Sequence, residues 1–481
     1  MRRGEQVVSA EERLLEAIAE DDEEGTEAAP RPARSVGRRH RQVVEKETDV
    51  QDFLGDGRRS HATAIVPRYY GELLTWALHR HIEAEGWKVV RTLNYHWPEP
   101  AYIDVSTDHD KGENLLMDGQ LLLEKGDMRF VATLDATGRR WRNCLRVEGL
   151  AGNGQDIEQF ISGVSSIAHN QNFYRGKKLE FAGRIRFLNL ASRSWDSVVL
   201  ASEVKAEIRA NTVEFLNKRD LWSRYGMPLK RGLLLAGEPG TGKTAICKAV
   251  LAEACGTTCI ATNAYALSAD KYITELYDLA QDLSPSIVLI EDIDSIGQNR
   301  EEFGYRMGPA LTSLLAVLDG IEEKGQIVTI ATTNSLDRLD KALAERPSRF
   351  DHVVELPRPT LEQRQAQIRQ LCQKVPLNSA AADYVARRSE GCTPAQVQEI
   401  LFSLAIEHAS QECDLWDASV SHGDIDRTIR RIRRNNGRRI GFGNGGSCDG
   451  NGSDRLSPLI LMPPIEVGNE KGACVAQNLE E

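Results

Sequence analysis

One eight-residue stretch decides the fold of this chain: Gly237-Glu238-Pro239-Gly240-Thr241-Gly242-Lys243-Thr244. It fits the pattern G-x-x-x-x-G-K-[S/T] at every fixed position, follows the apolar run 233–236 and precedes the helix-forming residues 245–250. A strand, a loop and a helix in this order are the context in which the pattern binds phosphate. The stretch therefore predicts a nucleotide site. A glycine-rich turn that merely joins a strand to a helix is the alternative.

Each residue type in this stretch has a physical reason to be there. The glycines 237, 240 and 242 allow backbone conformations that a Cβ forbids, so that successive N–H groups point at phosphate oxygens. The helix that follows adds the positive end of its dipole. Lys243 is expected to neutralise the β- and γ-phosphates, and the Thr244 hydroxyl to bind Mg²⁺. We therefore expect the whole stretch to hold ATP and Mg²⁺.

Strand and helix patterns alternate around the loop. After a long helix pattern over 202–219, strands are expected at 258–261, 286–290 and 327–331, and helices near 273–282 and 309–318. Several of these strands are almost entirely apolar, which indicates a parallel sheet covered on both faces. Beyond Pro357 the pattern is helical only, from residue 361 to about 434. The fold class predicted is α/β, a P-loop sheet followed by a small helical lid.

Polar side chains end two of the expected strands. Residues 286–290 lead directly into Glu291, Asp292 and Asp294. In a P-loop enzyme the strand beside the phosphate loop supplies one carboxylate to the Mg²⁺ shell and another to the attacking water. Adjacent acids at a strand end face opposite sides, so two roles are possible; a surface acid cluster is the alternative. Asn334 follows the next strand, where an amide can orient the lytic water or simply start a turn.

The N-terminal part has the composition of an α+β domain. An apolar stripe over 73–82 predicts a helix that ends at Gly86, and short strands follow up to residue 147. A helix over 156–168 and two strands, near Leu179 and over 185–188, complete this domain. The sequence shows no catalytic constellation in it. The histidines have no cysteine or carboxylate partner at ligand spacing, which favours ordinary surface or core roles for His79, His81 and His96.

Composition restricts the class of protein. The chain has 60 Lys and Arg against 71 Asp and Glu, a net charge of −11, which argues against a protein that mainly coats nucleic acid. Nine scattered cysteines without a signal peptide predict a reducing compartment, the cytoplasm. Cys255 and Cys259 are expected to be buried thiols rather than metal ligands. No apolar run approaches the ~20 residues of a membrane span.

The predicted organisation has five parts. The first and last are rich in charge or in Gly, Asn and Ser, which predicts disorder. In order, the parts are a disordered arm over 1–60, an α+β domain over 61–193, an ATPase core over 194–358, a helical lid over 359–435 and a disordered tail over 436–481.

These motifs together resemble the AAA family of ATPases over about residues 195–434. The residues that carry the resemblance are 225–235 before the loop, Leu318-Asp319-Gly320, Thr333-Asn334, Leu339-Asp340 and Arg346-Pro347-Ser348-Arg349-Phe350-Asp351. The resemblance implies that Asn334 is sensor 1 and that Arg346 and Arg349 are arginine fingers for the neighbouring subunit's nucleotide. A local ion pair with Glu345 or Asp351 is the alternative for these arginines. By position in the family, Glu291 serves the metal and Asp292 polarises the water.

Two departures narrow the resemblance. Glu291-Asp292 reverses the usual Asp-Glu order, and Thr393-Pro394-Ala395-Gln396 replaces the common start of the lid helix. Both features are similar to the mitochondrial translocase of the Rieske iron-sulfur protein and its soluble relatives, although this chain lacks that translocase's N-terminal membrane span. No arginine in residues 391–396 matches a sensor 2. We therefore expect the lid to act mainly by packing.

The resemblance implies a homo-oligomeric ring, expected to be hexameric, that acts on a protein substrate. Its central-pore aromatic is expected at Tyr265 or Tyr272, although either could be a core tyrosine. A nucleotide-gated scaffold with little turnover is one alternative, supported by the reversed acids. An ATPase acting on nucleic acid through the arginines of 430–434 and 438–439 is the other, but these residues suit the end of a helix better. Nucleic acid is therefore not expected as the main partner.

Overall fold

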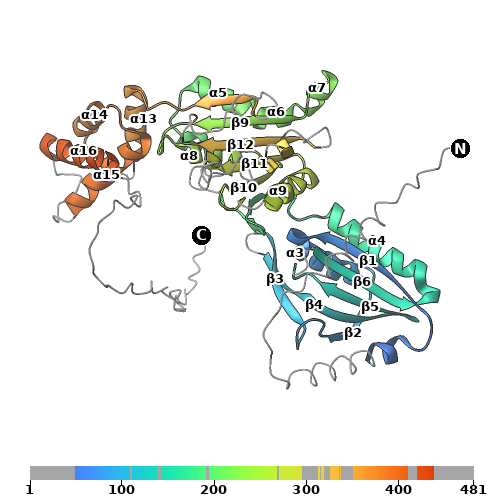
Figure 1. Cartoon of the computed structure of the whole chain (residues 1–481). Coiled ribbons are helices and arrows are strands. Elements are labelled where there is room, and N and C mark those ends of the chain that lie inside the picture. The colour runs from blue at the N-terminus through green and yellow to red at the C-terminus, as the bar shows by residue number, and fades with distance from the viewer. Residues whose placement is uncertain are drawn as a thin grey trace, which may run out of the picture. The chain divides into compact units, whose positions relative to one another are not determined.

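The computed structural model describes residues 49–108, 111–138, 142–190, 194–267, 270–294, 313–314, 316–318, 325–334, 336, 350–373, 375, 377–409 and 420–437. They form an N-terminal antiparallel sheet domain, a mainly parallel sheet with helices on both faces, and a group of C-terminal helices (Figure 1). The predicted fold class is therefore confirmed. The domain boundaries at residues 358 and 435 stay predictions.

The N-terminal domain is built on a six-stranded antiparallel sheet in the order β1-β6-β5-β4-β2, with β3 paired to β4. Its strands are β1 (Arg59–Pro67), β2 (Lys88–Leu93), β3 (Ala101–Asp108), β4 (Lys111–Lys125), β5 (Met128–Asp135) and β6 (Arg142–Leu150). Two helices pack against one face, α3 (Gly71–Ala84) and α4 (Gly154–Asn170), and short 3-10 turns precede them at Arg68–Tyr70 and Ala151–Asn153. Leu78, Phe130 and Leu145 lie fully buried in the core between them.

Residues 49–54 are helical and lie on the sheet face opposite α3 and α4. Val50 and Leu54 are buried there against Leu122 and Val131. The prediction of a disordered arm over 1–60 is therefore wrong for its last part. Val50 and Leu54 are spaced one helical turn apart, so both can be buried against a sheet although the surrounding segment is rich in charge. Residues 1–48 lie outside the described residues.

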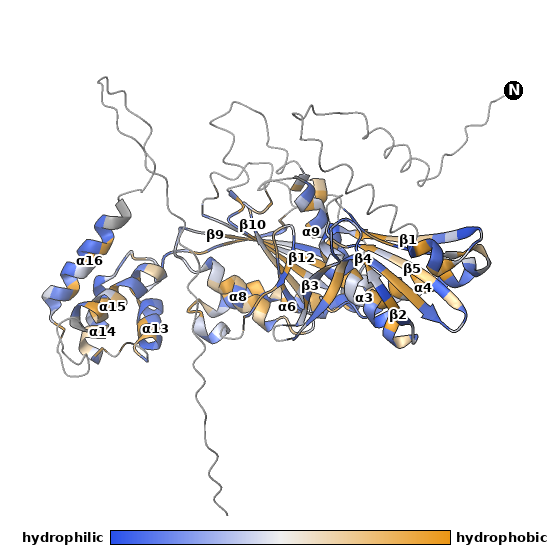
Figure 2. Ribbon diagram, turned by 90° about the horizontal axis from the view of Figure 1, so that it is seen from below, coloured by the Kyte–Doolittle hydropathy of each residue, from blue (hydrophilic) through white to orange (hydrophobic). Residues whose placement is uncertain are grey.

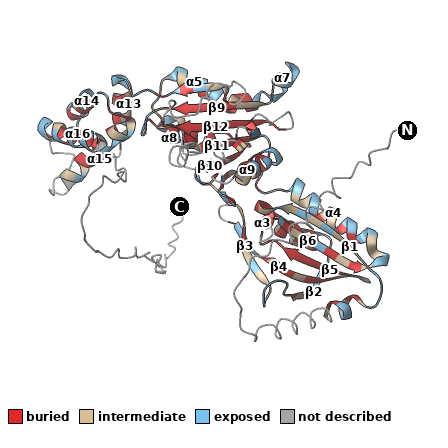
Figure 3. Ribbon diagram, viewed as in Figure 1, coloured by how far each residue is buried: buried red, intermediate tan, exposed pale blue. Residues whose placement is uncertain are grey.

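The second sheet has seven strands in the order β13-β9-β12-β11-β10-β7-β8. Its central members are β9 (Lys230–Ala236), β10 (Thr258–Asn263), β11 (Ser286–Glu291) and β12 (Ile327–Thr333), all mutually parallel, with β13 (His352–Glu355) added beside β9. Alternate residues of β9 and β11 enter two different cores. One includes α8 (Lys243–Glu253) and the other α9 (Asp270–Asp282), so the sheet is buried on both faces. Figure 3 shows these strands as mostly buried.

Strands β7 (Lys178–Phe181) and β8 (Ile185–Phe187) belong to this second sheet. Leu179 stands opposite Ile260 in a parallel pairing of β7 with β10, and β8 closes the edge antiparallel to β7. The prediction that these two strands complete the N-terminal domain is therefore wrong. Their position in the sequence suggested that domain. Strand pairing depends on the tertiary structure, however, and the parallel partner of β7 is β10, which lies far along the chain.

The predicted long helix over 202–219 is three short helices, α5 (Ser202–Ala210), α6 (Val213–Asn217) and α7 (Arg219–Arg224), with a short 3-10 turn before them at Trp195–Ser197. The break lies at Thr212, whose φ of −125° and ψ of −97° are not helical. The Thr212 hydroxyl donates to the carbonyl of Ile208, so a side chain competes with the helix. Because of this break, the side chains of Phe215 and Leu216 point into the hydrophobic core that also includes the buried residues of α8. The expected helix at 309–318 lies largely outside the described residues.

The C-terminal helices are α13 (Leu361–Leu371), α14 (Ser379–Arg388), α15 (Pro394–Ala409) and α16 (His422–Gly437). A reciprocal capping box of Thr360 and Gln363 starts α13. Ile368, Val385 and Leu401 share one buried cluster. Figure 2 shows hydrophilic residues predominating along α16. Among the helices that the structure describes, none has the length and apolar character needed to cross a membrane.

Candidate nucleotide-binding site

A cavity of about 490 Å³ lies where β9, β11 and β12 end. Ligands of open parallel sheets bind at this carboxyl edge. Of the predicted loop, residues 239–244 line the cavity, as do Asp292 and Asn334. The first two loop residues do not line it. Gly237 donates its N–H to the Thr333 carbonyl (3.2 Å), and Glu238 turns toward Arg358.

The loop owes its shape to two glycines in the left-handed region. Gly240 has a φ of +84° and Gly242 a φ of +100°, conformations that are costly for a residue with a Cβ. The Thr241 hydroxyl donates to the Glu238 carbonyl at 2.9 Å and closes the turn. Helix α8 begins at the next residue after Gly242, so its first N–H groups face the cavity. Backbone donors and a helix dipole therefore converge where phosphates would lie.

Lys243 is buried with its ammonium group folded over the loop. Its Nζ donates to the carbonyls of Gly237 (2.7 Å) and Glu238 (3.1 Å). Burial lowers the pKa of Lys243, and the carboxylates of Asp292 and Asp294 oppose that shift. A cation that is poorly hydrated and bound only to neutral carbonyls is well placed to exchange them for phosphate oxygens.

The acids at the end of β11 face different surroundings. Asp292 has a φ of +52°, and its Oδ1 accepts a hydrogen bond from Asn334 Nδ2 at 3.1 Å. Its N–H donates to Thr332 Oγ1 at 3.0 Å. Asp294 is buried and accepts the Asn334 N–H at 3.3 Å. The structure thus brings Asp292, Asn334 and the loop together, which sequence order alone only suggested.

Glu291 is the last residue of β11 and is not among the residues that line the cavity. Its Oε1 is buried and has no hydrogen-bond partner among the described residues. Burial raises the pKa of the Cys247 thiol, and the charge of Glu291 adds to that rise, which places this carboxylate on the α8 side of the strand. A buried carboxylate oxygen without a donor is costly, and it fits a site completed by a cation.

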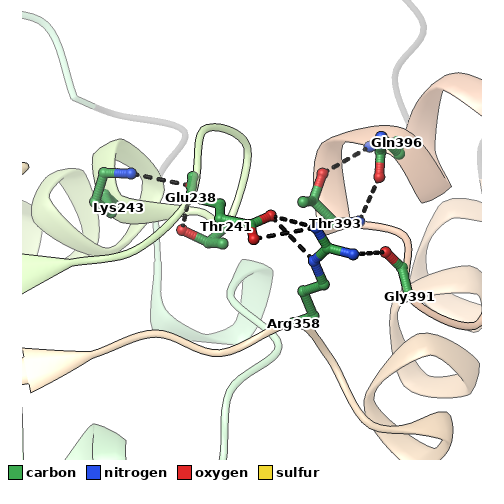
Figure 4. A network of polar contacts seen from close by, with 7 residues as sticks. All are labelled: Glu238, Thr241, Lys243, Arg358, Gly391, Thr393 and Gln396. Atoms are coloured by element: carbon green, nitrogen blue, oxygen red, sulfur yellow. Dashed lines mark hydrogen bonds and ion pairs between the residues drawn. The ribbon is translucent and has the colours of Figure 1, made fainter. Parts of the chain in front are cut away.

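The C-terminal helices supply the other wall of the cavity through Pro359, Gln363, Gln367, Pro394, Ala395 and Gln398. The N–H of Ala395, at the start of α15, donates to the Gly240 carbonyl at 3.1 Å. Thr393 and Gln396 cap this helix start reciprocally, because the Thr393 N–H donates to Gln396 Oε1 (2.7 Å) and the Gln396 N–H to Thr393 Oγ1 (3.4 Å) (Figure 4). The unusual lid-helix sequence therefore touches the phosphate loop directly.

Residues 197–200 also line the cavity, and the sequence analysis did not predict them as site residues. The sequence feature that could have indicated a role for them is the apolar triplet Val198-Val199-Leu200 shortly after Trp195-Asp196. Neighbouring residues hold this segment. Trp195 Nε1 donates to Glu253 Oε2, and the Asp196 carbonyl accepts from Gln370 Nε2 at 2.7 Å. Tertiary contacts such as these bring to the site a segment that precedes the loop by 37 to 40 residues.

Four other predicted residues divide into two groups. Arg346 and Arg349 lie outside the described residues, so their roles stay predictions. Tyr265, in the turn after β10, is 89% exposed. Tyr272, on α9, is half-buried under two cations, with Arg68 Cζ 5.7 Å and Lys271 Nζ 5.1 Å from its ring centroid. Tyr265 is therefore free of the core, whereas Tyr272 packs against it.

The prediction that both Cys255 and Cys259 are buried beside β10 is correct for one of them. Cys259 is buried, whereas Cys255 is exposed, so that part of the prediction is wrong. Cys255 lies in the turn after α8, where its side chain no longer faces the sheet.

Residues 233–358 match the family model described as "ATPase family associated with various cellular activities (AAA)". This chain contains an AAA ATPase domain. The AAA domain agrees with the site just described, because the matched range includes the phosphate loop, the acids and Asn334. The narrower resemblance to the Rieske-protein translocase stays a prediction.

Curated relatives are similar over longer stretches of the chain than this family match. An ATP-dependent zinc metalloprotease FtsH 3 of Sorangium cellulosum is 33% identical over 244 residues, which cover 48% of this chain and 40% of that protein. A proteasome-activating nucleotidase of Methanospirillum hungatei is 35% identical over 220 residues, 42% of this chain and 52% of that protein. FtsH 1 of Alkaliphilus metalliredigens is 28% identical over 345 residues, 68% of this chain and 54% of that protein. The chain thus spans about half the length of these relatives.

Proposed function

We propose that this protein is a ring-forming, Mg²⁺-dependent ATP hydrolase of the cytoplasm that uses ATP hydrolysis to remodel, unfold or translocate a protein substrate. The observation that carries the proposal is the convergence of Lys243, Asp292 and Asn334 on one cavity whose far wall comes from the C-terminal helices. Catalysis of phosphoryl transfer depends mainly on charged groups that are held in position around the phosphate and stabilise the charge of the transition state.

ATP would lie with its phosphates on residues 239–244, where Lys243 meets the β- and γ-phosphates. Its base and sugar would lie toward residues 197–200 and the glutamines of α13 and α15. Apolar Val198 and Leu200 suit the face of a purine, and the amides of Gln363 and Gln367 suit polar groups. Because both sheet and lid contribute to the cavity, bound nucleotide would couple the lid to the phosphate loop.

Mg²⁺ would be held by the Thr244 hydroxyl and the Glu291 carboxylate, whose buried, unpartnered Oε1 favours a nearby cation. When bound, the ion neutralises developing charge on the phosphates. Asp292 would accept the proton of the attacking water, and Asn334 would hold Asp292 in position through the 3.1 Å hydrogen bond. Arg346 and Arg349 would complete the neighbouring subunit's site in the ring.

A protein substrate is favoured by two observations. Tyr265 is almost fully exposed on the turn after β10, as a residue that grips an extended chain must be. Two of the similar proteins are, by name, a protease and a proteasome-activating nucleotidase, whose work concerns proteins. We therefore propose that Tyr265 contacts the substrate, with Tyr272 in a packing role.

A steady-state ATPase assay with the full chain, run with and without DNA and with and without an unfolded protein, tests the proposal. We expect Mg²⁺-dependent hydrolysis that DNA does not stimulate and that Lys243→Ala abolishes. Lys248→Ala, on the same helix but outside the cavity lining, is the matched control and should keep the parental rate. Tight ATP binding without turnover would favour the nucleotide-gated scaffold, and strong DNA stimulation would favour a nucleic-acid ATPase; either result contradicts the proposal.

A further inference from the structure

A second group of ionisable side chains lies in the N-terminal domain, outside the nucleotide site. Strands β4 and β5 place Asp118 and Asp135 directly opposite each other. Asp118 is fully buried and Asp135 is 8% exposed. Like charges opposite each other across a strand pair are destabilising, and burial out of water increases that cost. A cation placed between the two carboxylates would offset this cost.

His96, in the connection between β2 and β3, meets both carboxylates. Its Nδ1 lies 2.6 Å from Asp118 Oδ2 and 3.8 Å from Asp135 Oδ2. The one ligand atom that each residue offers lies within 4.8 Å of the other two. A single ring N–H can serve only one carboxylate at a time, so the imidazole by itself leaves the pair incompletely neutralised.

The other oxygen of each carboxylate is already held in place. Asp118 Oδ1 accepts the backbone N–H of His96 at 2.9 Å. Asp135 Oδ1 accepts from the Thr137 hydroxyl at 2.7 Å and from the Thr137 N–H at 3.2 Å. Hydrogen bonds of this kind orient the ligands of a metal from outside its first shell. Both Oδ2 atoms are consequently turned toward His96 Nδ1.

We propose that His96, Asp118 and Asp135 bind a divalent transition-metal ion of the Zn²⁺ or Mn²⁺ class. One imidazole nitrogen with two carboxylate oxygens is a ligand set that such ions accept. Ligand atoms ~2.0–2.1 Å from a tetrahedral Zn²⁺ lie ~3.3 Å apart. The two separations measured from Nδ1, 2.6 and 3.8 Å, bracket that value, so the ion would require one to lengthen by about 0.7 Å and the other to shorten by about 0.5 Å.

The proposed ion would join three elements that are distant in sequence. It would tie the β2–β3 connection to the middle of β4 and the end of β5, and with it the half-exposed rings of Tyr95 and Trp97 on either side of His96. Three protein ligands leave a fourth position for water or for a donor atom of a partner. Residue spacing does not reveal this cluster, because the two carboxylate partners of His96 lie 22 and 39 positions away along the chain.

Metal binding by the full-length protein tests the proposal. Protein treated with a chelator, then dialysed and kept free of nucleotide, is titrated with Zn²⁺ or with Mn²⁺ alone by calorimetry, and metal content is measured after gel filtration. His96→Ala and the isosteric Asp135→Asn remove ligands, and His61→Ala removes an exposed histidine of the same domain as the matched control. We expect both ligand variants to lose one equivalent, or to bind it at least tenfold more weakly, while His61→Ala retains it.

Thiols can also bind Zn²⁺, but all variants keep the same cysteines, so the difference between variants reports on this site. Thermal melting gives a second readout, because an ion that binds only the folded state raises its melting temperature. The rise should occur in the parent and in His61→Ala, and be absent in Asp135→Asn and His96→Ala. No site-specific equivalent in the parent, or undiminished binding in the two ligand variants, would overturn the proposal and leave a hydrogen-bonded His–Asp pair.

Discussion

The guanidinium of Arg358 binds the carboxylate of Glu238 through two nitrogens, with Nη2 2.8 Å and Nε 3.0 Å from Oε2 and Nη2 3.0 Å from Oε1 (Figure 4). Its Nη1 also donates to the Gly391 carbonyl at 2.9 Å. Glu238 lies in the phosphate loop and Gly391 just before α15. One side chain at the end of the core therefore connects the loop to the lid. Residues 391–396 contain no arginine to act as a sensor 2, and this link to the lid comes instead from residue 358.

Arg358→Ala should change nucleotide exchange more than it changes stability. Both side chains are about half exposed, and exposed ion pairs contribute only ~0–1 kcal/mol to the free energy of unfolding. Loss of the link to Gly391 should nevertheless release the lid and speed dissociation of a fluorescent ATP analogue several-fold, measured by stopped flow. Arg369→Ala, an exposed arginine of α13, is the control. If Glu238→Ala and Arg358→Ala act additively in the double variant, they do not work as a pair.

Gly240→Ala and Gly242→Ala should differ at the lid although both strain the backbone. A Cβ on Gly240 would lie 2.9 Å from Ala395 Cβ and 2.9 Å from Thr393 Oγ1, whereas a Cβ on Gly242 meets nothing within 4 Å. Gly240→Ala should therefore also push α15 away and break the Ala395 N–H bond to the Gly240 carbonyl. Hydrogen exchange at the start of α15, measured by mass spectrometry, should be faster in Gly240→Ala than in Gly242→Ala. Equal exchange in the two variants would mean that strain alone matters.

Asp292→Asn and Glu291→Gln should separate the base from the metal ligand. Asp292→Asn keeps the side-chain shape but cannot take a proton, so hydrolysis should fall ~10²–10⁴-fold while ATP still binds with Mg²⁺. Glu291→Gln should weaken the Mg²⁺ dependence of ATP binding as well. Single-turnover hydrolysis and nucleotide affinity with and without Mg²⁺ measure both effects. An Asp292→Asn enzyme at the parental rate, beside a dead Glu291→Gln, would make Glu291 the base.

Tyr265→Ala should abolish protein remodelling and leave basal ATP hydrolysis and melting temperature unchanged, because its ring is 89% exposed. Tyr272→Ala should instead lower the melting temperature, since it removes packing against the core and two cation–π contacts. Unfolding of a labelled model substrate, ATPase rate and thermal melting are measured on both variants. A stable Tyr272→Ala that alone loses remodelling would reverse the assignment.

Arg346 and Arg349 should act in trans. An arginine finger can contribute ~10³-fold or more to the rate, so Arg349→Ala rings and Lys243→Ala rings should each be almost inactive. Mixed rings regain intact sites at some interfaces and should recover part of the activity. Native mass spectrometry confirms the mixing. Absence of recovery in confirmed mixed rings would contradict a role in the neighbouring site.

Local sequence was sufficient for the phosphate loop and for the α/β class. The conformation of residues 237–244 can be predicted locally, because the glycines permit the backbone conformation of the loop and the helix that follows supplies its dipole. The apolar run that leads into Glu291 and Asp292 predicted a buried strand with acids at its end, and β11 ends at Glu291. The nearly all-apolar strands likewise predicted a sheet covered on both faces, and alternate residues of β9 and β11 enter two cores.

Tertiary structure alone decided which distant segments meet. No local pattern indicates that β7 pairs with β10, that residues 197–200 reach the cavity, or that His96 meets Asp118 and Asp135. A strand's partner and a side chain's neighbours depend on the packing of the whole domain, whereas propensity and periodicity report only on a few adjacent residues. The sequence by itself therefore determined the glycine-rich loop and its strand–loop–helix context, and the folded chain determined which residues surround that loop.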